Sequence, residues 1–143
     1  LDQVRGQVMF MLDDHGAKRD AYRAQLPDLA DREIFVDVPE TDPDAAVMVV
    51  NDPLGDGDRI RDLVSTGFIV RTRADADTVQ ARTGDTSMRD AAFASGAQYV
   101  STDYVFPEDP FHTGYTVDLP GDTPARCNPV NAPRQCPRVD LSG

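Results

Sequence analysis

Short apolar runs alternate with amphipathic segments along most of the chain, which has 143 residues. The apolar runs are rich in Val, Ile, Met and Phe at successive positions, so both faces of each run would be buried. That pattern is typical of strands in a parallel sheet. It predicts buried strands at Gln7–Leu12, Ala46–Val50, Phe68–Val70 and Ala97–Val100, with a shorter strand-like piece at Ile34–Val38.

The segments between these runs have the spacing and the end residues of helices. Tyr22 and Leu26 are four residues apart on the first helix, and Asp58 is expected to cap the second. Glycines that can adopt a left-handed conformation are expected to end the second and third helices. The predicted helices are residues 17–26, a helix from Asp58 to Gly67, and Ser87–Ala94 before Gly96. The resulting order, β-α-β-α-β-α-β, predicts βαβ units on a parallel sheet.

The last part of the chain, after Phe106, is rich in Pro, Gly and Asp and contains both cysteines, Cys127 and Cys136. Their spacing fits neither a CxxC redox motif nor half of a zinc site. A local disulfide is the favoured interpretation and indicates an oxidising compartment outside the cytoplasm. Two free thiols in a cytosolic protein are the alternative. We therefore expect an α/β part over residues 1–106 and an irregular, disulfide-clipped tail over residues 107–143.

Acidic residues outnumber basic ones, with 25 Asp and Glu against 14 Lys and Arg and a formal net charge of −11. Such a chain has no basic surplus to replace phosphate counterions, so we expect no nucleic-acid partner. Its apolar runs are too short for a transmembrane segment. The chain begins at Leu1 without a recognisable signal peptide, so we expect a processed protein or part of a longer one.

Polar side chains follow each predicted strand. The carboxyl ends of parallel strands meet at one edge, which is the active-site rim of a (β/α)8 barrel and the ligand crevice of an open sheet. A generic polar loop is the alternative at any single strand end. The residues at these ends are Asp13 and Asp14, Asn51 and Asp52, Arg71, Arg73 and Asp75, and Thr102, Asp103 and Tyr104.

Arg71, Arg73 and Asp75 are the most informative of these residues, because they share one face if the strand continues that far. Guanidinium groups form paired hydrogen bonds to phosphate oxygens, and a carboxylate accepts hydrogen bonds from sugar hydroxyls. The three residues therefore predict a site for a phosphate and a polyol. A ladder of Arg–Asp pairs on the surface is the alternative.

The other candidate residues are less specific. Asp103 and Tyr104 could orient a substrate hydroxyl and stack on a ring, or could be a buried turn-capping carboxylate and a core tyrosine. Asp13 could bind a hydroxyl or a metal ion, or could be a helix N-cap. His15 could be a general acid or base, although a histidine in a loop is usually solvated. His112, in the tail, is a weaker candidate.

Several motifs form one series along the chain. The most specific are Val70-Arg-Thr-Arg-Ala-Asp75 and Ser95-Gly-Ala-Gln-Tyr-Val-Ser-Thr-Asp-Tyr104, and the others are Gly6-Gln-Val-Met-Phe-Met-Leu-Asp13-Asp, Val50-Asn-Asp-Pro, Gly114-Tyr, Leu119-Pro-Gly and Ala125-Arg-Cys-Asn-Pro-Val. Together they resemble the bacterial Ca²⁺-dependent phosphoinositide phospholipase C family, within the wider superfamily of phospholipase C-like phosphodiesterases with a TIM barrel.

The resemblance implies that this chain is the C-terminal half of a (β/α)8 TIM barrel, with about four parallel βα units. It implies that the catalytic histidines and most Ca²⁺-ligating acids lie on the first strands, outside this sequence. The implied reaction is attack of the inositol 2-hydroxyl on phosphorus, with one histidine as base, another as acid and Ca²⁺ on the phosphate.

We therefore expect part of a secreted, Ca²⁺-dependent phosphodiesterase that cleaves an inositol or glycerol phospholipid head group and is inactive as an isolated chain. Its expected partners are the substrate and either the missing barrel half or a second copy of itself. The alternative is a non-catalytic α/β module that binds a polyol phosphate or a protein partner. Asp13 is the expected metal ligand in this half. The expected substrate-positioning residues are Arg71, Arg73, Asp75, Asp103, Tyr104 and Asn51.

Overall fold

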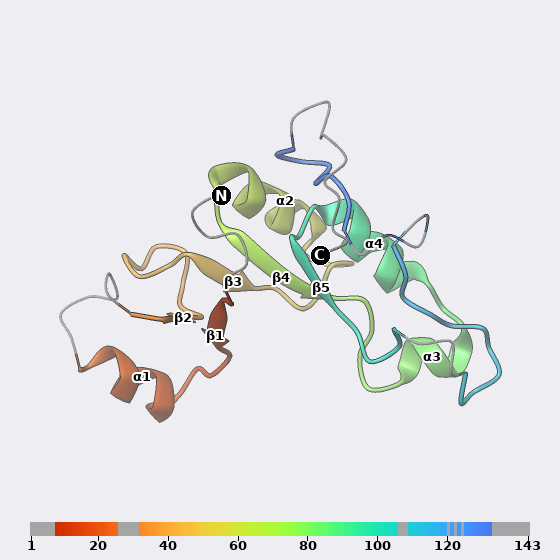
Figure 1. Ribbon diagram of the computed structural model, residues 1–143, viewed down its shortest axis with the longest axis horizontal. Helices are drawn as coiled ribbons and strands as arrows, with labels where there is room; N and C mark the ends of the chain where they lie inside the picture. Colours follow the sequence, from red (N-terminus) through yellow and green to blue (C-terminus); the bar gives the residue numbers. More distant parts are fainter. Residues whose placement is uncertain are drawn as a thin grey trace. The chain divides into compact units, whose positions relative to one another are not determined.

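A computed structural model of the chain describes residues 8–25, 32–105, 109–119, 121, 123 and 125–132. The chain divides into two compact units, Leu1–Val49 and Val50–Gly143. None of the helices in the described ranges is both long enough and apolar enough to cross a membrane. The elements in chain order are β1 (Phe10–Leu12), α1 (Ala17–Arg23), β2 (Ile34–Val36), β3 (Val47–Val49), α2 (Gly57–Thr66), β4 (Ile69–Arg73), α3 (Val79–Thr83), α4 (Ser87–Ser95) and β5 (Tyr99–Ser101), as labelled in Figure 1.

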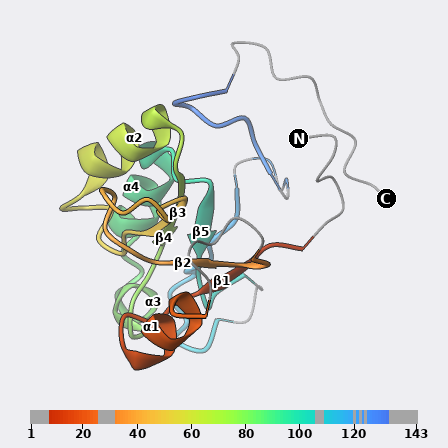
Figure 2. The ribbon, with the colours of Figure 1, turned by 90° about the vertical axis from the view of Figure 1, so that its left-hand side faces the viewer.

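The first unit contains a parallel pair of strands, which Figure 2 shows side by side. Phe10 of β1 lies opposite Ile34 of β2, and the pairing continues to Leu12 and Val36. Helix α1 connects the two strands, which makes this segment a βαβ unit as predicted. The guanidinium of Arg23, the last residue of α1, donates to carboxylates of the loop before β3, and these bonds fix the end of the helix on that loop.

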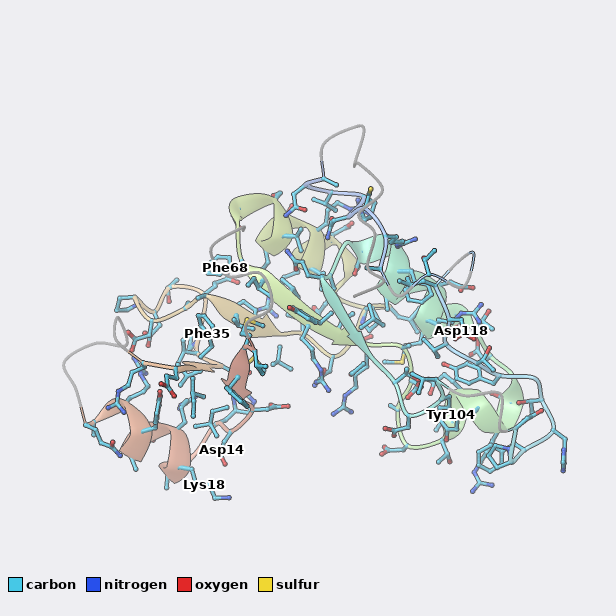
Figure 3. All side chains as sticks on the ribbon, in the orientation of Figure 1. Asp14, Lys18, Phe35, Phe68, Tyr104 and Asp118 are labelled. Atoms are coloured by element: carbon cyan, nitrogen blue, oxygen red, sulfur yellow. The ribbon has the colours of Figure 1, made fainter. Side chains whose placement is uncertain are left out.

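The expectation that the first strand is buried on both faces is wrong for its described residues. Phe10 is 58% exposed, and the other two residues of β1 are only half-buried. Phe35 of β2, labelled in Figure 3, is 38% exposed. A strand is buried on both faces only where other elements pack on each face of its sheet. The residues of β3, by contrast, are buried or half-buried.

The second unit has β4 and β5 as parallel neighbours, with Arg71 opposite Tyr99 and Arg73 opposite Ser101. Helices α2 and α4 pack on each other and on β4 (Figure 1). Their buried side chains follow a helical spacing and meet the buried face of β4, so apolar burial holds the helices on the strands. These side chains are Ile60, Leu63 and Val64 of α2, Met88 and Ala92 of α4, and Val70 and Thr72 of β4.

The predicted helix ends are mostly confirmed. Gly67 and Gly96 adopt left-handed conformations, with φ of 105° and 84°, directly after α2 and α4. The expected cap at Asp58 is wrong, because α2 begins at Gly57 and Asp58 lies in its first turn. The short helix α3 was not predicted, because its one buried residue, Ala81, leaves no apolar spacing to detect.

The described part of the tail packs on the second unit. The Tyr115 hydroxyl donates to Ala74 O at 3.0 Å, and Val117 N donates to Tyr104 O at 2.9 Å. Residues 109–119 therefore contribute Tyr115 and Val117 to the hydrophobic cluster that contains Ala74, just after β4. The tail boundary near residue 106 stays a prediction. So does the disulfide, because Cys136 lies outside the described residues.

Residues 125–132 reach the end of α4 through a second set of contacts. Asn128 Nδ2 donates to Gly96 O at 2.6 Å, and the Arg126 guanidinium donates to Phe93 O and lies over the Phe93 ring. A Cβ added at Gly96 would clash with Val130 Cγ2. The glycine therefore allows both the left-handed turn and the close approach of the tail.

We expect Gly96→Ala to lower the free energy of unfolding by about 1–3 kcal/mol, from left-handed strain and the clash with Val130. Gly67→Ala is the matched control, because Gly67 is also left-handed but has no atom within 4 Å of an added Cβ. Denaturant unfolding measures both variants. Equal losses in the two variants would show that the clash between the added Cβ and Val130 costs no stability.

Candidate functional site

The alternation of β4 places two arginines on one face of the strand. Val70 and Thr72 are buried, whereas Arg71 and Arg73 are half-buried on the other face. The sequence prediction that the two arginines share a face is therefore confirmed. The strand ends at Arg73, so its alternation does not extend to the third residue of the predicted group, Asp75.

A cavity of about 280 Å³ lies where β4 and β5 end. It brings together Arg71, Arg73, Asp75 and Asp103, which the sequence proposed as substrate-positioning residues. Thr102, another of the strand-end residues noted in the sequence, also lines it. Reasoning from the sequence did not single out the remaining lining residues, Ala76, Asp77 and Ser101.

The two arginines differ in how they are held. Arg71 Nη1 donates to Asn51 Oδ1 at 2.8 Å, so Asn51, a predicted site residue, orients a guanidinium from the segment after β3. The Arg73 guanidinium has neither a hydrogen bond nor an ion pair within the described part of the chain. Asp103 is exposed beside it at the cavity. The cavity therefore combines an oriented guanidinium, one that has no polar partner among the described residues, and an exposed carboxylate.

Asp75 is only 6% exposed, and its carboxylate points to other partners than the arginines. The Thr102 hydroxyl donates to Asp75 Oδ2, and the Tyr115 hydroxyl lies 3.5 Å from the same oxygen. Burial raises the pKa of Tyr115 from 10.0 to about 12, and the negative charge of Asp75 adds to the increase. Asp75 therefore joins the end of β4, the end of β5 and the tail.

Tyr104 does not line the cavity. Its ring meets the Tyr115 ring edge-on, with centroids 5.5 Å apart and planes at 85°. Figure 3 labels Tyr104 near α3 and the tail. This placement corresponds to the alternative of a core tyrosine, which the sequence had left open.

The turn that follows Asp75 has an unusual backbone. Asp77 and Thr78 have φ angles of 50° and 70°, in the left-handed region that non-glycine residues seldom adopt. The side chain of Gln80 accepts a hydrogen bond from Ala76 N at 3.0 Å, which helps to hold this turn. Two consecutive strained residues at the rim of a cavity are a common feature of ligand sites. Because the turn contains no glycine, its left-handed backbone could not be predicted from the sequence.

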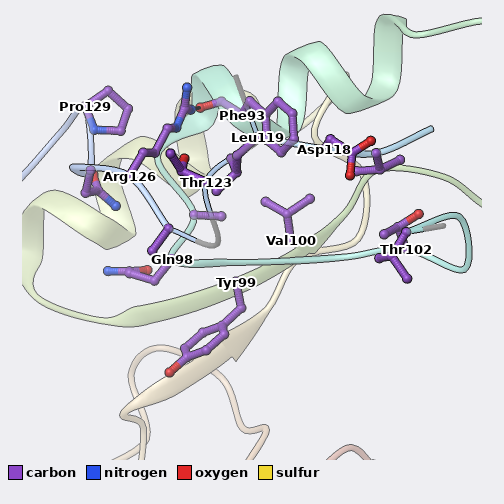
Figure 4. A pocket seen from close by; sticks show the side chains of 15 residues that line it. Phe93, Gln98, Tyr99, Val100, Thr102, Asp118, Leu119, Thr123, Arg126 and Pro129 are labelled. Carbon is purple, nitrogen blue, oxygen red and sulfur yellow. Dashed lines mark hydrogen bonds between the residues drawn. The ribbon is translucent and has the colours of Figure 1, made fainter. Parts of the chain in front are cut away.

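A second, larger cavity of about 600 Å³ lies between α4, β5 and the tail (Figure 4). Figure 4 shows Val100 on the side of Phe93 and Leu119, whereas Tyr99 points away from them. Its described lining includes none of the predicted substrate-positioning residues.

In the first unit, ligand atoms of Asp13, His15 and Asp37 all lie within 4.8 Å of one another. Asp13 was predicted as a metal ligand. Asp37 was missed, although a carboxylate between two valines in an apolar piece is unusual. Ca²⁺ takes 6–8 oxygen ligands, whereas this group offers an imidazole and two carboxylates. In the ranges described here, no other three His, Cys, Asp or Glu residues converge in this way, so the described residues do not fit a Ca²⁺ site.

Fold and cavity together define an α/β protein whose parallel strands β4 and β5 end at a polar cavity. The chain belongs to the family described as phosphoinositide phospholipase C, Ca²⁺-dependent, whose family model matches residues 1–129. The comparisons with curated proteins and with solved structures give no significant match.

Membership of the family confirms the resemblance to Ca²⁺-dependent phosphoinositide phospholipase C, whereas a bacterial origin stays a prediction. It implies phospholipase C-like phosphodiesterase activity on a phosphoinositide for the full protein, with Ca²⁺ as its cofactor. The parallel strands and helices are consistent with half of a TIM barrel.

Proposed function

We propose that this chain forms the substrate-positioning half of a secreted phosphoinositide phospholipase C-like enzyme. Its cavity at the ends of β4 and β5 would bind the phosphate and hydroxyl groups of the lipid head group. The observation that supports this role best is the pair Arg71 and Arg73 on one face of β4, at a cavity that also contains Asp103.

The chemistry of the cavity suits such a ligand. Guanidinium groups bind phosphate oxygens in pairs, and the partly enclosed cavity strengthens those bonds. Asp103 would accept hydrogen bonds from ring hydroxyls. The cavity of about 280 Å³ is at the small end of ligand sites, so it suits a head group better than a whole lipid.

In this proposal the catalytic histidines belong to another part of the enzyme. The sequence has two histidines, His15 and His112, and neither lines the cavity with the arginines. Phosphodiester cleavage by an internal hydroxyl needs a base for that hydroxyl and an acid for the leaving group. Arginines at pH 7 supply neither function, because they stay protonated.

The exposed strands of the first unit support a partner for this half. Phe10, Val8 and Met9 are 58%, 76% and 37% exposed at β1 and just before it. Parallel strands are normally covered on both faces, and unpaired edges recruit further strands. The missing barrel half, or a second copy of the chain, would cover them. Secretion is proposed from the two cysteines, with a Cys127–Cys136 disulfide, and the acidic composition.

The test compares the isolated chain with the chain mixed with a polypeptide that supplies the missing strands and histidines, in the presence of Ca²⁺. We expect no hydrolysis of phosphatidylinositol by the chain alone and measurable release of inositol phosphate by the mixture. A reunited protein that folds, binds inositol phosphate and stays inactive would favour the alternative, a non-catalytic module that binds a polyol phosphate. Activity of the chain alone would contradict the division of roles.

A further inference from the structure

The first unit brings together a second group of chemically reactive side chains, apart from the arginine cavity. Asp13 and His15 lie in the loop that follows β1, and Asp37 comes directly after β2. Since β1 and β2 are parallel neighbours in register, their carboxyl ends lie at the same edge. The fold of this unit alone therefore accounts for the convergence of the three ligand atoms within 4.8 Å.

Asp37 provides an independent indication that a cation belongs here. Its side chain is only 8% exposed, yet among the described residues its carboxylate has only weak partners. Val49 N donates to Oδ1 at 3.4 Å, and His15 Nε2 lies 3.4 Å from Oδ2. Both distances exceed the usual range for N–H···O bonds, roughly 2.7–3.2 Å. A buried carboxylate without strong partners is costly, and a bound cation would offset that cost.

Arg19, which contacts Asp37, does not supply a charge to the carboxylate. Arg19 Nη1 donates to the backbone oxygen of Asp37 at 3.2 Å, and the same guanidinium pairs with the carboxylate of Asp20. Asp14, the other acid of the loop, accepts from Gly16 N at 2.8 Å, in the turn before α1. The carboxylate of Asp37 is therefore directed toward His15 and Asp13.

The donor set selects the kind of cation. One imidazole with two carboxylates suits Zn²⁺ and its first-row neighbours, whereas Ca²⁺ and Mg²⁺ prefer oxygen ligands alone. Ligand atoms bound at about 2.0–2.2 Å to one ion are at most about 4.4 Å apart. The His15 side chain is 66% exposed and Asp13 is exposed, so small rotations bring all three within reach.

We propose that Asp13, His15 and Asp37 form a binding site for a first-row transition-metal dication, with Zn²⁺ as the representative ion, distinct from the Ca²⁺ that serves the family's reaction. Three protein ligands leave one position of a tetrahedral site for water. The site shares no residue with the arginine cavity, so this proposal does not depend on the proposed function.

Calorimetric titration of the untagged, chelator-treated chain with Zn²⁺ and, separately, with Ca²⁺ tests the proposal. We expect one Zn²⁺ per chain, with affinity at least 10-fold weaker in His15→Ala, and weaker Ca²⁺ binding than Zn²⁺ binding. His112→Ala is the matched control, because it removes the other histidine and should leave Zn²⁺ affinity unchanged. Circular dichroism checks the fold, and the exposure of His15 makes its replacement harmless to folding.

Cobalt substitution separates this site from the cysteines of the tail. Co²⁺ bound by imidazole and carboxylates gives no thiolate charge-transfer band, whereas Co²⁺ on cysteine sulfur does. We expect a Co²⁺ spectrum without that band, lost in Asp37→Asn as well as in His15→Ala. A thiolate band, an unchanged Zn²⁺ affinity in His15→Ala, or tighter Ca²⁺ than Zn²⁺ binding would each overturn the proposal.

Discussion

Arg73→Ala is expected to weaken the binding of inositol 1-phosphate to the chain by about 10–100-fold, since a charge-assisted hydrogen bond contributes roughly 1.5–3 kcal/mol. The Arg73 guanidinium lines the cavity without an ion pair in the described residues, so a bound phosphate would be its partner. The variant removes no hydrogen bond or ion pair among the described residues. Isothermal titration or NMR titration with inositol 1-phosphate measures the change.

Two further variants make this prediction specific. Arg73→Lys keeps the charge but cannot form a paired bond, so it should lose less affinity than Arg73→Ala. Arg61→Ala removes the same charge from α2, where the guanidinium donates to Ala94 O at 2.9 Å and does not line the cavity. We expect it to change affinity by less than about 2-fold. Equal losses of affinity in Arg73→Ala and Arg61→Ala would mean that binding of inositol 1-phosphate depends on net charge alone.

The arginine pair could be predicted from the sequence because it depends on local periodicity alone. Side chains two residues apart share a face of any strand, and a strand at Phe68–Val70 was expected from its apolar run. The carboxyl-end position then followed from the parallel order of the elements. Both steps use only neighbours along the chain, so Arg71 and Arg73 were placed correctly without any long-range contact.

The inward orientation of Asp75 could not be predicted in the same way. Its partners, Thr102 and Tyr115, are 27 and 40 residues further along the chain. Nothing local to Asp75 distinguishes a carboxylate aimed at a substrate from one aimed at a tyrosine in the tail. The predicted face also required the strand to continue to residue 75, whereas β4 ends at Arg73.

The first strand, β1, shows a second reason why burial could not be predicted fully from the sequence. An apolar run reports that a segment tends to be buried, not which molecule or segment buries it. Phe10 is largely exposed with the neighbours that the structure describes, although its run was the longest of the predicted strands. Asp37 was overlooked for the converse reason, because its role depends on the pairing of β2 with β1.

Asp75→Ala is expected to lower the free energy of unfolding by about 2–3 kcal/mol, because the charge-assisted bond from Thr102 is lost and that half-buried hydroxyl is left without its acceptor. Asp75 is 6% exposed and accepts from Thr102, with the Tyr115 hydroxyl at 3.5 Å from the same oxygen. Denaturant unfolding at neutral pH measures the loss. Asp103→Ala is the control, because it removes an exposed carboxylate from the same cavity and should cost less than about 0.5 kcal/mol.

The same variant should also change the dependence of stability on alkaline pH. The pKa of Tyr115 is raised from 10.0 to about 12 in the folded chain, so the folded state keeps a proton that the unfolded state loses. The resulting stabilisation is complete below pH 10 and is lost as pH rises through 12. In Asp75→Ala the charge that adds to the shift is gone, so this pKa falls and stability should decline less steeply between pH 10 and 12.

Tyr115→Phe separates the titration of this residue from that of the other tyrosines. It removes the contribution of Tyr115 altogether and leaves Tyr22, Tyr99 and Tyr104 in place. Unfolding free energies at pH 9 and pH 11 should therefore differ most in the unmodified chain, less in Asp75→Ala and least in Tyr115→Phe. Equal differences in the unmodified chain and Asp75→Ala, with a small loss at neutral pH, would show that Asp75 does not join the strand ends to the tail.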